Sequence, residues 1–296
     1  MTALVVAAAL GWLSGAPMPE ARTEVAAAVV RSEIALVGGL TTSGAPSPRV
    51  DAYSPAADRW RRLPDLPAGR HHALAASDGR RLYVVGGYGD PLGGGGPTRT
   101  AWILASGAWH ALPRLPEPRA AGGAAVIRGK LYVVGGRGPA GLARKAFALD
   151  LATRRWRLTP APAPREHLAV TAAAGKIYAV GGRKAGYDTN LATFESWAPG
   201  AKRWTRLAPL PGARGGTGAA AANGSIVSIG GEAPSGTIRS VYAYSLATAR
   251  WRRLPDLPTP RHGLGVAAIG TRVYAIAGGP APGLTVSDAN EHIDLA

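Results

Sequence analysis

The chain has 296 residues, is 46% hydrophobic, carries a formal net charge of +16 and contains no cysteine. That hydrophobic content excludes an intrinsically disordered chain, and the missing cysteine excludes disulfides, zinc–thiolate sites and thiol catalysis. The charge comes from scattered arginine, so it reflects either attraction to polyanions or simply an arginine-rich composition.

The N-terminal residues form a short apolar run, Ala3 to Leu10. The run is too short to span a membrane. Small residues at 7–9 would suit signal cleavage, but no basic segment precedes the run. We therefore interpret residues 1–9 as either a signal-peptide remnant or the lead-in to a strand, which leaves both a cytoplasmic and an exported location open.

A pattern that recurs six times begins with an arginine, and a pair of small residues follows 16 positions later. The arginines are Arg22, Arg70, Arg119, Arg165, Arg214 and Arg261. The pairs are Gly38-Gly39, Gly86-Gly87, Gly135-Gly136, Gly181-Gly182, Gly230-Gly231 and Ala277-Gly278. Two apolar runs separated by a turn lie between them. Turn dipeptides such as Asp78-Gly79 and Asn223-Gly224 favour tight hairpins, so each copy is predicted to contain a β-hairpin.

A third strand follows each small pair, and a tryptophan follows the third strand. The aromatic-to-tryptophan spacing is seven residues in four copies, as in Tyr53 to Trp60, Trp102 to Trp109, Trp197 to Trp204 and Tyr244 to Trp251. The third copy has Leu149 at the aromatic position before Trp156. The unit is therefore four short strands in about 46 to 49 residues, which is typical of propeller blades. We expect the large aromatic residues to fill the layers between blades.

The two ends of the repeat array complement each other. The sixth copy stops before its tryptophan, and Trp12 precedes Arg22 by ten residues, as Trp60 precedes Arg70. Gly11-Trp12-Leu13 is thus predicted to be the outer strand of the last blade. The fold class is all-β: residues 10–296 form a single six-bladed β-propeller of four-stranded blades, closed by the N-terminal strand, which removes open sheet edges.

The glycine pair, the spaced aromatic residues and the repeat length resemble the kelch repeat, and the resemblance covers residues 10–296. Leu149, Ala277, Glu291 and Ile293 depart from the kelch pattern and affect the packing of blades three and six. The resemblance implies a propeller that binds proteins or glycans on loops at one face. Some relatives are enzymes, such as galactose-oxidase-like copper enzymes and a sialic-acid mutarotase. The copper chemistry needs a Tyr–Cys crosslink, which this chain cannot form.

A candidate ligand-binding rim lies at the channel mouth, where the opening arginines and the loops after the small pairs are expected to converge. The arginines either clamp an acidic ligand or satisfy groups within their own blades. Residues that break the symmetry are better candidates. The predicted rim consists of the six opening arginines with His71, His72, Tyr88, Arg137, Glu166, His167, Arg183, Glu232 and His262.

Glu24 also lies beside an opening arginine. The rim is either a solvated polar surface or a site for a polar ligand or acid–base chemistry. Histidines 71, 72, 167 and 262 come from three blades, but no local ligand spacing indicates a metal, so we assign no metal, no cofactor and no catalytic residue.

We therefore predict a non-catalytic scaffold, a monomer, that recognises a protein segment or acidic glycan at the channel mouth. No motif indicates a specific nucleic acid, and no segment is long enough to span a membrane. The alternative is a sugar-active propeller, such as a mutarotase or epimerase acting on an acidic sugar. A third possibility is a component of larger assemblies. A rim where a glutamate, an arginine and a histidine converge would favour the enzyme, and a shallow rim would favour the scaffold.

Overall fold

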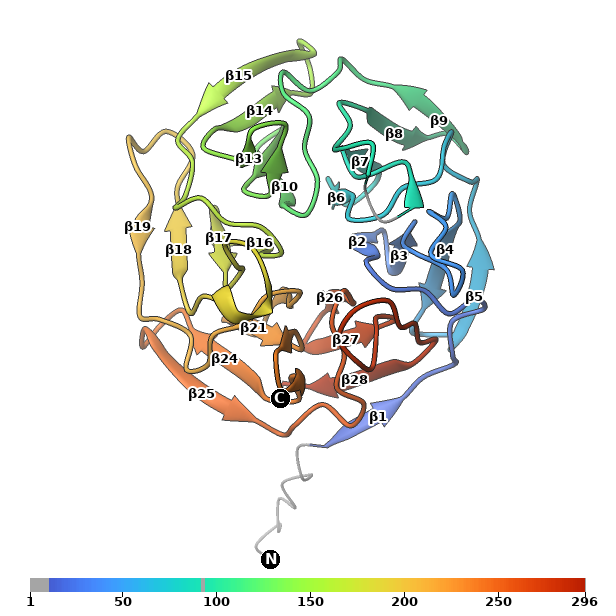
Figure 1. The fold of residues 1–296 in the computed structure, drawn as a ribbon, viewed down its shortest axis with the longest axis vertical. Coiled ribbons are helices and arrows are strands. Elements are labelled where there is room, and N and C mark those ends of the chain that lie inside the picture. Colours follow the sequence, from blue (N-terminus) through green and yellow to red (C-terminus); the bar gives the residue numbers. More distant parts are fainter. Residues whose placement is uncertain (1–10, 92–93, 296) are drawn as a thin grey trace, which may run out of the picture.

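Six four-stranded antiparallel sheets surround a central channel in the computed structural model, which describes residues 11–91 and 94–295 (Figure 1). Within each sheet the strands follow chain order from the channel outwards, except that the outer strand of the last sheet comes from the N-terminus. The predicted six-bladed β-propeller is confirmed. The prediction for residues 1–9 lies outside the described residues.

The blades are built from four concentric sets of strands. The innermost strands are β2 (Ala26–Val30), β6 (Leu74–Ser77), β10 (Gly123–Ile127), β16 (Ala169–Ala173), β20 (Gly218–Ala222) and β26 (Gly265–Ile269). The second strands are β3 (Glu33–Val37), β7 (Leu82–Val85), β11 (Lys130–Val134), β17 (Lys176–Val180), β21 (Ser225–Ile229) and β27 (Arg272–Ile276). The third strands are β4 (Val50–Ser54), β8 (Ala101–Ala105), β14 (Ala146–Asp150), β18 (Phe194–Trp197), β24 (Val241–Ser245) and β28 (Asn290–Asp294). The outer strands are β5 (Arg59–Arg62), β9 (Ala108–Ala111), β15 (Arg155–Thr159), β19 (Thr205–Arg206), β25 (Arg250–Leu254) and β1 (Trp12–Ser14).

The loops after the small pairs carry additional short elements. Blade 3 has a two-stranded hairpin of β12 (Arg137–Gly138) and β13 (Gly141–Leu142), and blade 5 has one of β22 (Glu232–Ala233) and β23 (Gly236–Thr237). Blade 4 has a single 3-10 turn, η2 (Tyr187–Thr189), at the equivalent place. These loops therefore differ from blade to blade on one face of an otherwise repetitive scaffold.

The N-terminal strand closes the ring, as predicted. In the antiparallel pair of β1 with β28, Trp12 lies opposite Ile293 and Ser14 lies opposite Glu291. Blade 6 therefore depends on segments from both ends of the described chain.

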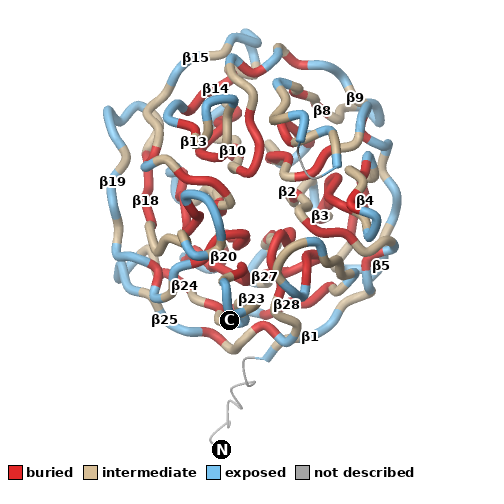
Figure 2. Tube along the Cα trace, viewed as in Figure 1, coloured by how far each residue is buried: buried red, intermediate tan, exposed pale blue. Residues whose placement is uncertain are grey.

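Burial follows the position of each strand in its blade (Figure 2). The second strands are buried on both faces because a neighbouring blade packs against each side, and every residue of β7 and β21 is buried. The outer strands are largely exposed, as in β5 and β9. The core is thus a closed series of interfaces between blades.

Each outer-strand tryptophan connects its blade to the preceding blade. The indole nitrogens donate to main-chain carbonyls at 2.8–2.9 Å, and the pairs are Trp12 with Pro255, Trp60 with Ala16, Trp109 with Pro64, Trp156 with Pro113, Trp204 with Pro160 and Trp251 with Ala208. These tryptophans are only partly buried. Tyrosines such as Tyr53, Tyr83 and Tyr274 fill the inner layers instead. The six indole bonds form a belt around the whole ring.

The prediction that Trp102 is the third-strand aromatic residue paired with Trp109 was wrong. Leu104, and not Trp102, lies opposite Trp109, as Tyr53 lies opposite Trp60 in blade 1. The turn between β8 and β9 is two residues shorter than the turn in blade 1, which brings Trp102 to the same seven-residue spacing by coincidence. Trp102 occupies a different position in its blade, described below.

The small pairs allow neighbouring blades to approach closely. Gly86 has a φ of +65°, and a Cβ atom there would lie 2.0 Å from the carbonyl oxygen of Arg119 in the next blade. The amide of Gly87 donates to that same oxygen at 2.8 Å. Only glycine fits this approach without strain. Ala277 holds the equivalent place in blade 6 with a φ of +61°, so blade 6 accepts a strained residue there.

Candidate functional site

A ring of six residues surrounds the channel just inside one face, and we call it the neck ring. Its members are the residues two positions after each opening arginine: Glu24, His72, Ala121, His167, Gly216 and Gly263. Main-chain hydrogen bonds of 2.7–3.1 Å run between successive members from residue 24 to residue 263, and the amide of Val25 donates to the carbonyl of Gly263 at 3.2 Å to complete the circuit. The neck ring is therefore held rigidly by the backbone of all six blades.

Every member of the neck ring has a positive φ, between 50° and 67°. Glycine adopts this left-handed conformation freely, whereas each other residue type costs about 1 kcal/mol or more. Gly216 and Gly263 show what the backbone prefers, and Ala121 is a small substitute. A glutamate and two histidines at the remaining positions indicate that their side chains, and not the backbone, account for their presence.

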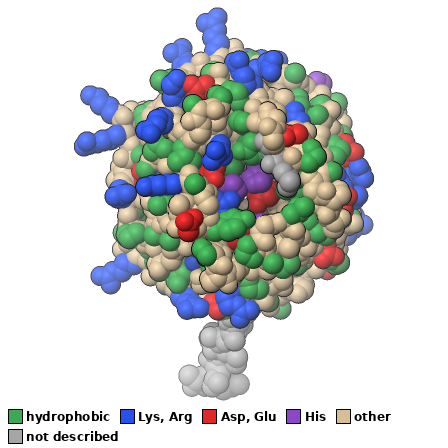
Figure 3. All heavy atoms as spheres, viewed as in Figure 1, with side chains coloured by type: hydrophobic (Ala, Val, Ile, Leu, Met, Phe, Trp, Pro, Cys, Tyr) green, Lys and Arg blue, Asp and Glu red, His purple; other side chains and the backbone are tan. Residues whose placement is uncertain are grey.

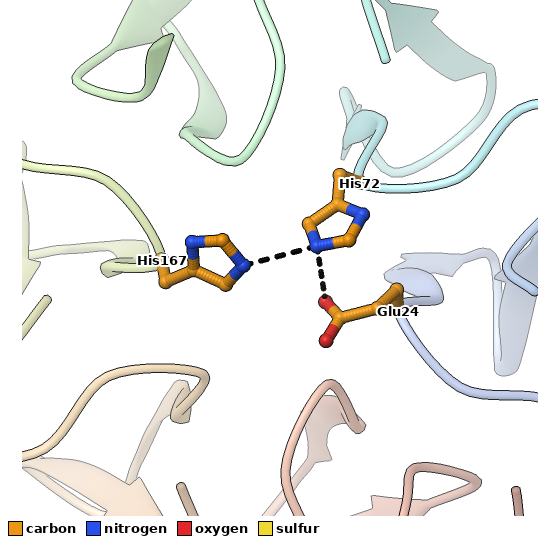
Figure 4. Close-up of side chains that lie close together, drawn as sticks. All are labelled: Glu24, His72 and His167. Atoms are coloured by element: carbon orange, nitrogen blue, oxygen red, sulfur yellow. Dashed lines mark hydrogen bonds and ion pairs between the residues drawn. The ribbon is translucent and has the colours of Figure 1, made fainter. Parts of the chain in front are cut away.

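The three large side chains of the neck ring point to one place in the channel (Figure 4). The Nε2 atom of His72 lies 3.0 Å from Nε2 of His167 and 3.1 Å from Oε2 of Glu24. These side chains are only 11–14% exposed. Because they come from blades 1, 2 and 4, only the closed ring brings them together.

Polar groups lie behind both histidines. Nδ1 of His72 lies 2.7 Å from Nδ1 of His71, and Nε2 of His71 lies 3.0 Å from the main-chain oxygen of Asp90. Nδ1 of His167 lies 3.5 Å from a carboxylate oxygen of Glu166. Both Nε2 atoms of the neck ring are thereby directed towards the channel axis.

A cavity of about 440 Å³ opens above the neck ring at the channel mouth. Its wall includes Tyr88, Arg137, Glu166, Arg183, Glu232 and His262, together with the neck-ring histidines and Glu24. Figure 3 shows histidine and acidic side chains gathered in a hollow near the centre of this face. All residues of the predicted rim except the six opening arginines therefore converge in one cavity.

Ion pairs connect the wall of this mouth cavity. Arg137 donates to Glu166 at 3.1 Å, and Arg183 donates to Glu232 at 2.7 Å. Arg183 is 8% exposed and stacks on Tyr187, whereas the side chain of Arg137 is 42% exposed. Arg137 is thus the more accessible of the two cations.

The charges in the mouth cavity are set by burial and by mutual contacts. Burial disfavours the ionised carboxylate of Glu24, but the imidazoles around it outweigh that cost and hold its pKa well below the usual range. Burial lowers the pKa of His72 to about 3. Burial also opposes protonation of His262, yet its contacts with Glu24 and Glu232 raise its pKa. The cavity therefore holds ionised carboxylates beside at least one neutral imidazole.

The six opening arginines lie inside the blades and not at the rim. They are 0–8% exposed. Five of them donate to the carbonyl of the first residue of the small pair in their own blade, as Arg119 does to Gly135 at 3.1 Å, and Arg70 donates to Gly69. Their guanidinium groups thus satisfy main-chain carbonyls where the strands end.

One further position in each blade, which was not predicted from the sequence, balances the buried arginine. The residue sits on the third strand, opposite the residue two before the small pair. In blades 1, 4 and 6 it is an acid that pairs with the arginine at 2.5–2.6 Å: Asp51, Glu195 and Glu291. In blades 2, 3 and 5 it is an aromatic ring under the guanidinium at 4.9–5.6 Å: Trp102, Phe147 and Tyr242. The acids and the aromatic rings are equivalent because they share one register position on the third strand, and their residue types alone do not indicate this.

Below the neck ring the side chains that line the channel become small and mostly apolar. A cavity of about 130 Å³ lies at the neck, and a second of about 260 Å³ follows it, lined mostly by alanine and valine of the innermost strands. The charged and imidazole side chains that line the channel are therefore concentrated at the neck and mouth. Among the described residues, no helix has both the length and the apolar character to cross a membrane.

Fold, repeat and channel together define a kelch-type propeller. Residues 104–279 match the family model described as the KLHDC2/KLHL20/DRC7 Kelch-repeats domain. Because this match covers more than half of the 296 residues, the chain belongs to the kelch-repeat family. A kelch propeller is consistent with a protein-binding scaffold.

Beta-scruin of Limulus polyphemus is similar to part of the chain. It is 34% identical over 83 residues, which make up 28% of this chain and 9% of beta-scruin. The alignment thus spans under a tenth of that protein and supports the repeat alone.

Proposed function

We propose that this propeller is a binding scaffold that recognises an acidic protein segment at its channel mouth. The observation that carries the proposal is the break in symmetry at the mouth cavity. Elsewhere the blades repeat the same arginines, glycines and tryptophans, but the mouth cavity contains different polar side chains in each blade. A volume of about 440 Å³ accommodates one or two side chains of a partner.

Arg137 is the group that best fits an acidic side chain. Its guanidinium has five N–H donors, and one of its nitrogens bonds to Glu166 at 3.1 Å. Within residues 11–91 and 94–295 no further side-chain partner occupies its other donors, so they can hold a planar carboxylate, which arginine binds by paired hydrogen bonds. Tyr88 lies on the same cavity wall and offers a hydroxyl. Arg183 is less accessible, because Glu232 and Tyr187 already occupy it.

The first test is binding of the purified chain to an array of acidic peptides and acidic glycans at physiological salt. Loss of one charge-assisted pair of hydrogen bonds costs about 1.5–3 kcal/mol, so Arg137→Ala should weaken binding about 10- to 100-fold. Arg137→Lys should restore little, because lysine lacks the planar fork. Arg144→Ala is the matched control, since Arg144 is exposed on the same blade and does not line the cavity.

Equal loss of binding in the Arg137 and Arg144 variants would refute the proposal, because it would show that only the overall charge matters. The same conclusion follows if binding is indiscriminate across the array and vanishes with added salt. A hit confined to peptides supports the scaffold as stated. Binding confined to acidic sugars would show that the ligand of the mouth cavity is a glycan and would refute the proposed protein ligand.

A sugar-active enzyme is the second candidate, and the convergence of glutamate, arginine and histidine in one cavity favours it. It ranks second because the kelch-repeat family match is consistent with a binding scaffold. Glu24 and Glu166 lie in one cavity with His72, His167 and Arg137, which is the arrangement that acid–base chemistry on a bound sugar requires. Any sugar found on the array should then be tested for anomeric exchange by NMR. Glu166→Gln should slow the exchange with little change in sugar affinity, and an unchanged exchange rate rules this activity out.

A further inference from the structure

We propose that the neck ring binds one divalent transition-metal ion, of the Zn²⁺ type, through Oε2 of Glu24, Nε2 of His72 and Nε2 of His167. The site goes beyond the proposed binding function and does not depend on it. Sequence spacing did not indicate it, because the three ligands come from three different blades. The argument rests on the distances between the atoms, the tautomers and the space around them.

Two of the three distances between these atoms fit a shared ion. Two ligand atoms that are each about 2.1 Å from one metal lie about 3.0 Å apart at a right angle and about 3.4 Å apart at the tetrahedral angle. The two Nε2 atoms are 3.0 Å apart, and Oε2 of Glu24 is 3.1 Å from Nε2 of His72. All three ligand atoms lie within 4.8 Å of one another. Two imidazoles with one carboxylate are a common ligand set for zinc and related ions.

The hydrogen bonds around His72 leave a lone pair on its Nε2. The main-chain oxygen of Asp90 can only accept, so Nε2 of His71 carries the proton in that contact. Nδ1 of His71 lies 2.7 Å from Nδ1 of His72, a distance at which a proton on Nδ1 of His72 is donated to His71. In that tautomer Nε2 of His72 carries the lone pair, and it faces Nε2 of His167 and Oε2 of Glu24.

His167 has the orientation of a second imidazole ligand. Its Nδ1 lies 3.5 Å from Oε1 of Glu166 without a hydrogen bond, which places a carboxylate behind the distal nitrogen, as in many metal-bound histidines. The other carboxylate oxygen of Glu24, Oε1, lies 3.3 Å from His262, which leaves Oε2 for the ion. His72 is thus positioned by a hydrogen bond, whereas His167 and Glu24 each have an oppositely polar neighbour within 3.5 Å.

The rest of the neck ring leaves space for an ion with open coordination positions. Ala121, Gly216 and Gly263 have little or no side chain: Ala121 lies between the two histidines in the circuit, and the two glycines lie between His167 and Glu24. The mouth cavity lies above the site and the 130 Å³ cavity lies at the neck itself. Three protein ligands with at least one open position are typical of zinc sites that bind water or a ligand directly.

The test uses the tag-free full chain after removal of metals with a chelator. Zn²⁺ is titrated by calorimetry, and Co²⁺ is titrated as a spectroscopic probe whose visible absorption reports nitrogen and oxygen ligands. We expect one ion per chain. Glu24→Gln, His72→Ala and His167→Ala should each weaken binding at least about 100-fold, since even the loss of an outer partner costs 10- to 100-fold. No peptide or sugar is present, so this result is independent of the proposed function.

The variants are designed to keep the fold. Ala121 and Gly216 already occupy equivalent positions, and glycine adopts the positive φ of the neck ring without strain. In the presence of chelator, His72→Gly and His167→Gly should therefore have a thermal unfolding midpoint equal to or above that of the wild type. His110→Ala is the matched control, because His110 is an exposed histidine on β9. The proposal is overturned if wild-type protein binds no ion, if folded His72→Gly binds as tightly as wild type, or if His110→Ala removes the binding.

Discussion

Glu195 offers the sharpest test of how the buried arginines are balanced. Arg165 is fully buried and donates to three main-chain carbonyls, but Glu195 is the acid that neutralises it, at 2.5 Å. Glu195→Leu keeps a similar volume and leaves the guanidinium charge uncompensated. Removal of one partner of a buried ion pair lowers the free energy of unfolding by about 3–5 kcal/mol. For a chain of 296 residues, this lowers the melting temperature by roughly 5–8 °C, from the usual unfolding entropy per residue.

Glu195→Phe should be less harmful than Glu195→Leu. Blade 3 has Phe147 at the equivalent position, with the guanidinium of Arg119 5.6 Å from the ring centre. A cation over an aromatic face recovers about 0.5–2 kcal/mol. The Phe variant should therefore melt between the Leu variant and the wild type.

Thermal and urea unfolding at neutral pH, followed by tryptophan fluorescence, measures all three proteins. A Leu variant within about 1 kcal/mol of the wild type would show that the main-chain carbonyls alone stabilise the charge. A Phe variant that melts with the Leu variant would show that an aromatic residue does not replace the acid. Either result would refute the conclusion that an acid and an aromatic ring are equivalent partners of the buried arginine.

Two further predictions concern the outer belt and the blade tyrosines. Trp12→Phe removes the indole donor to the Pro255 carbonyl and should lower the free energy of unfolding by about 1 kcal/mol in urea; an unchanged midpoint means that this bond does not stabilise the closure. Burial and the hydrogen bond to Asp78 raise the pKa of Tyr83 to about 12, so its contribution is complete below the ordinary tyrosine pKa and is lost as the pH rises through 12. Tyr83→Phe should therefore lose less stability than the wild type between about pH 10 and 12, and identical losses by urea unfolding at each pH would contradict the assignment.

The repeat made most of the fold predictable from the sequence. The interval from arginine to the small pair, the hairpin turns and the position of Trp12 each repeat a local requirement of one blade. Because all six blades share these requirements, the number of blades and the closing strand followed from spacing alone. The spacing failed at Trp102, where a shortened turn imitated the expected interval.

The candidate site was predictable in part. The sequence identified the polar residues beside the arginines and after the small pairs, because those loops face the channel mouth in every blade. It could not show that the arginines turn into the blades, since that depends on acids and aromatic rings that lie on a different strand. Nor could it show that His72 and His167, 95 residues apart, meet across the channel.

The closing strand also determines the order in which the ring can be completed during synthesis. The strand at Trp12 is made early but has no sheet to join until Ile293 and its neighbours have left the ribosome. Closing so long a loop is slow compared with forming hairpins within a blade. Five blades can therefore assemble while the first strand waits as an unpaired edge. A chain that ends within the last blade therefore loses more than that blade, because the N-terminal strand β1 is also left without its partner β28.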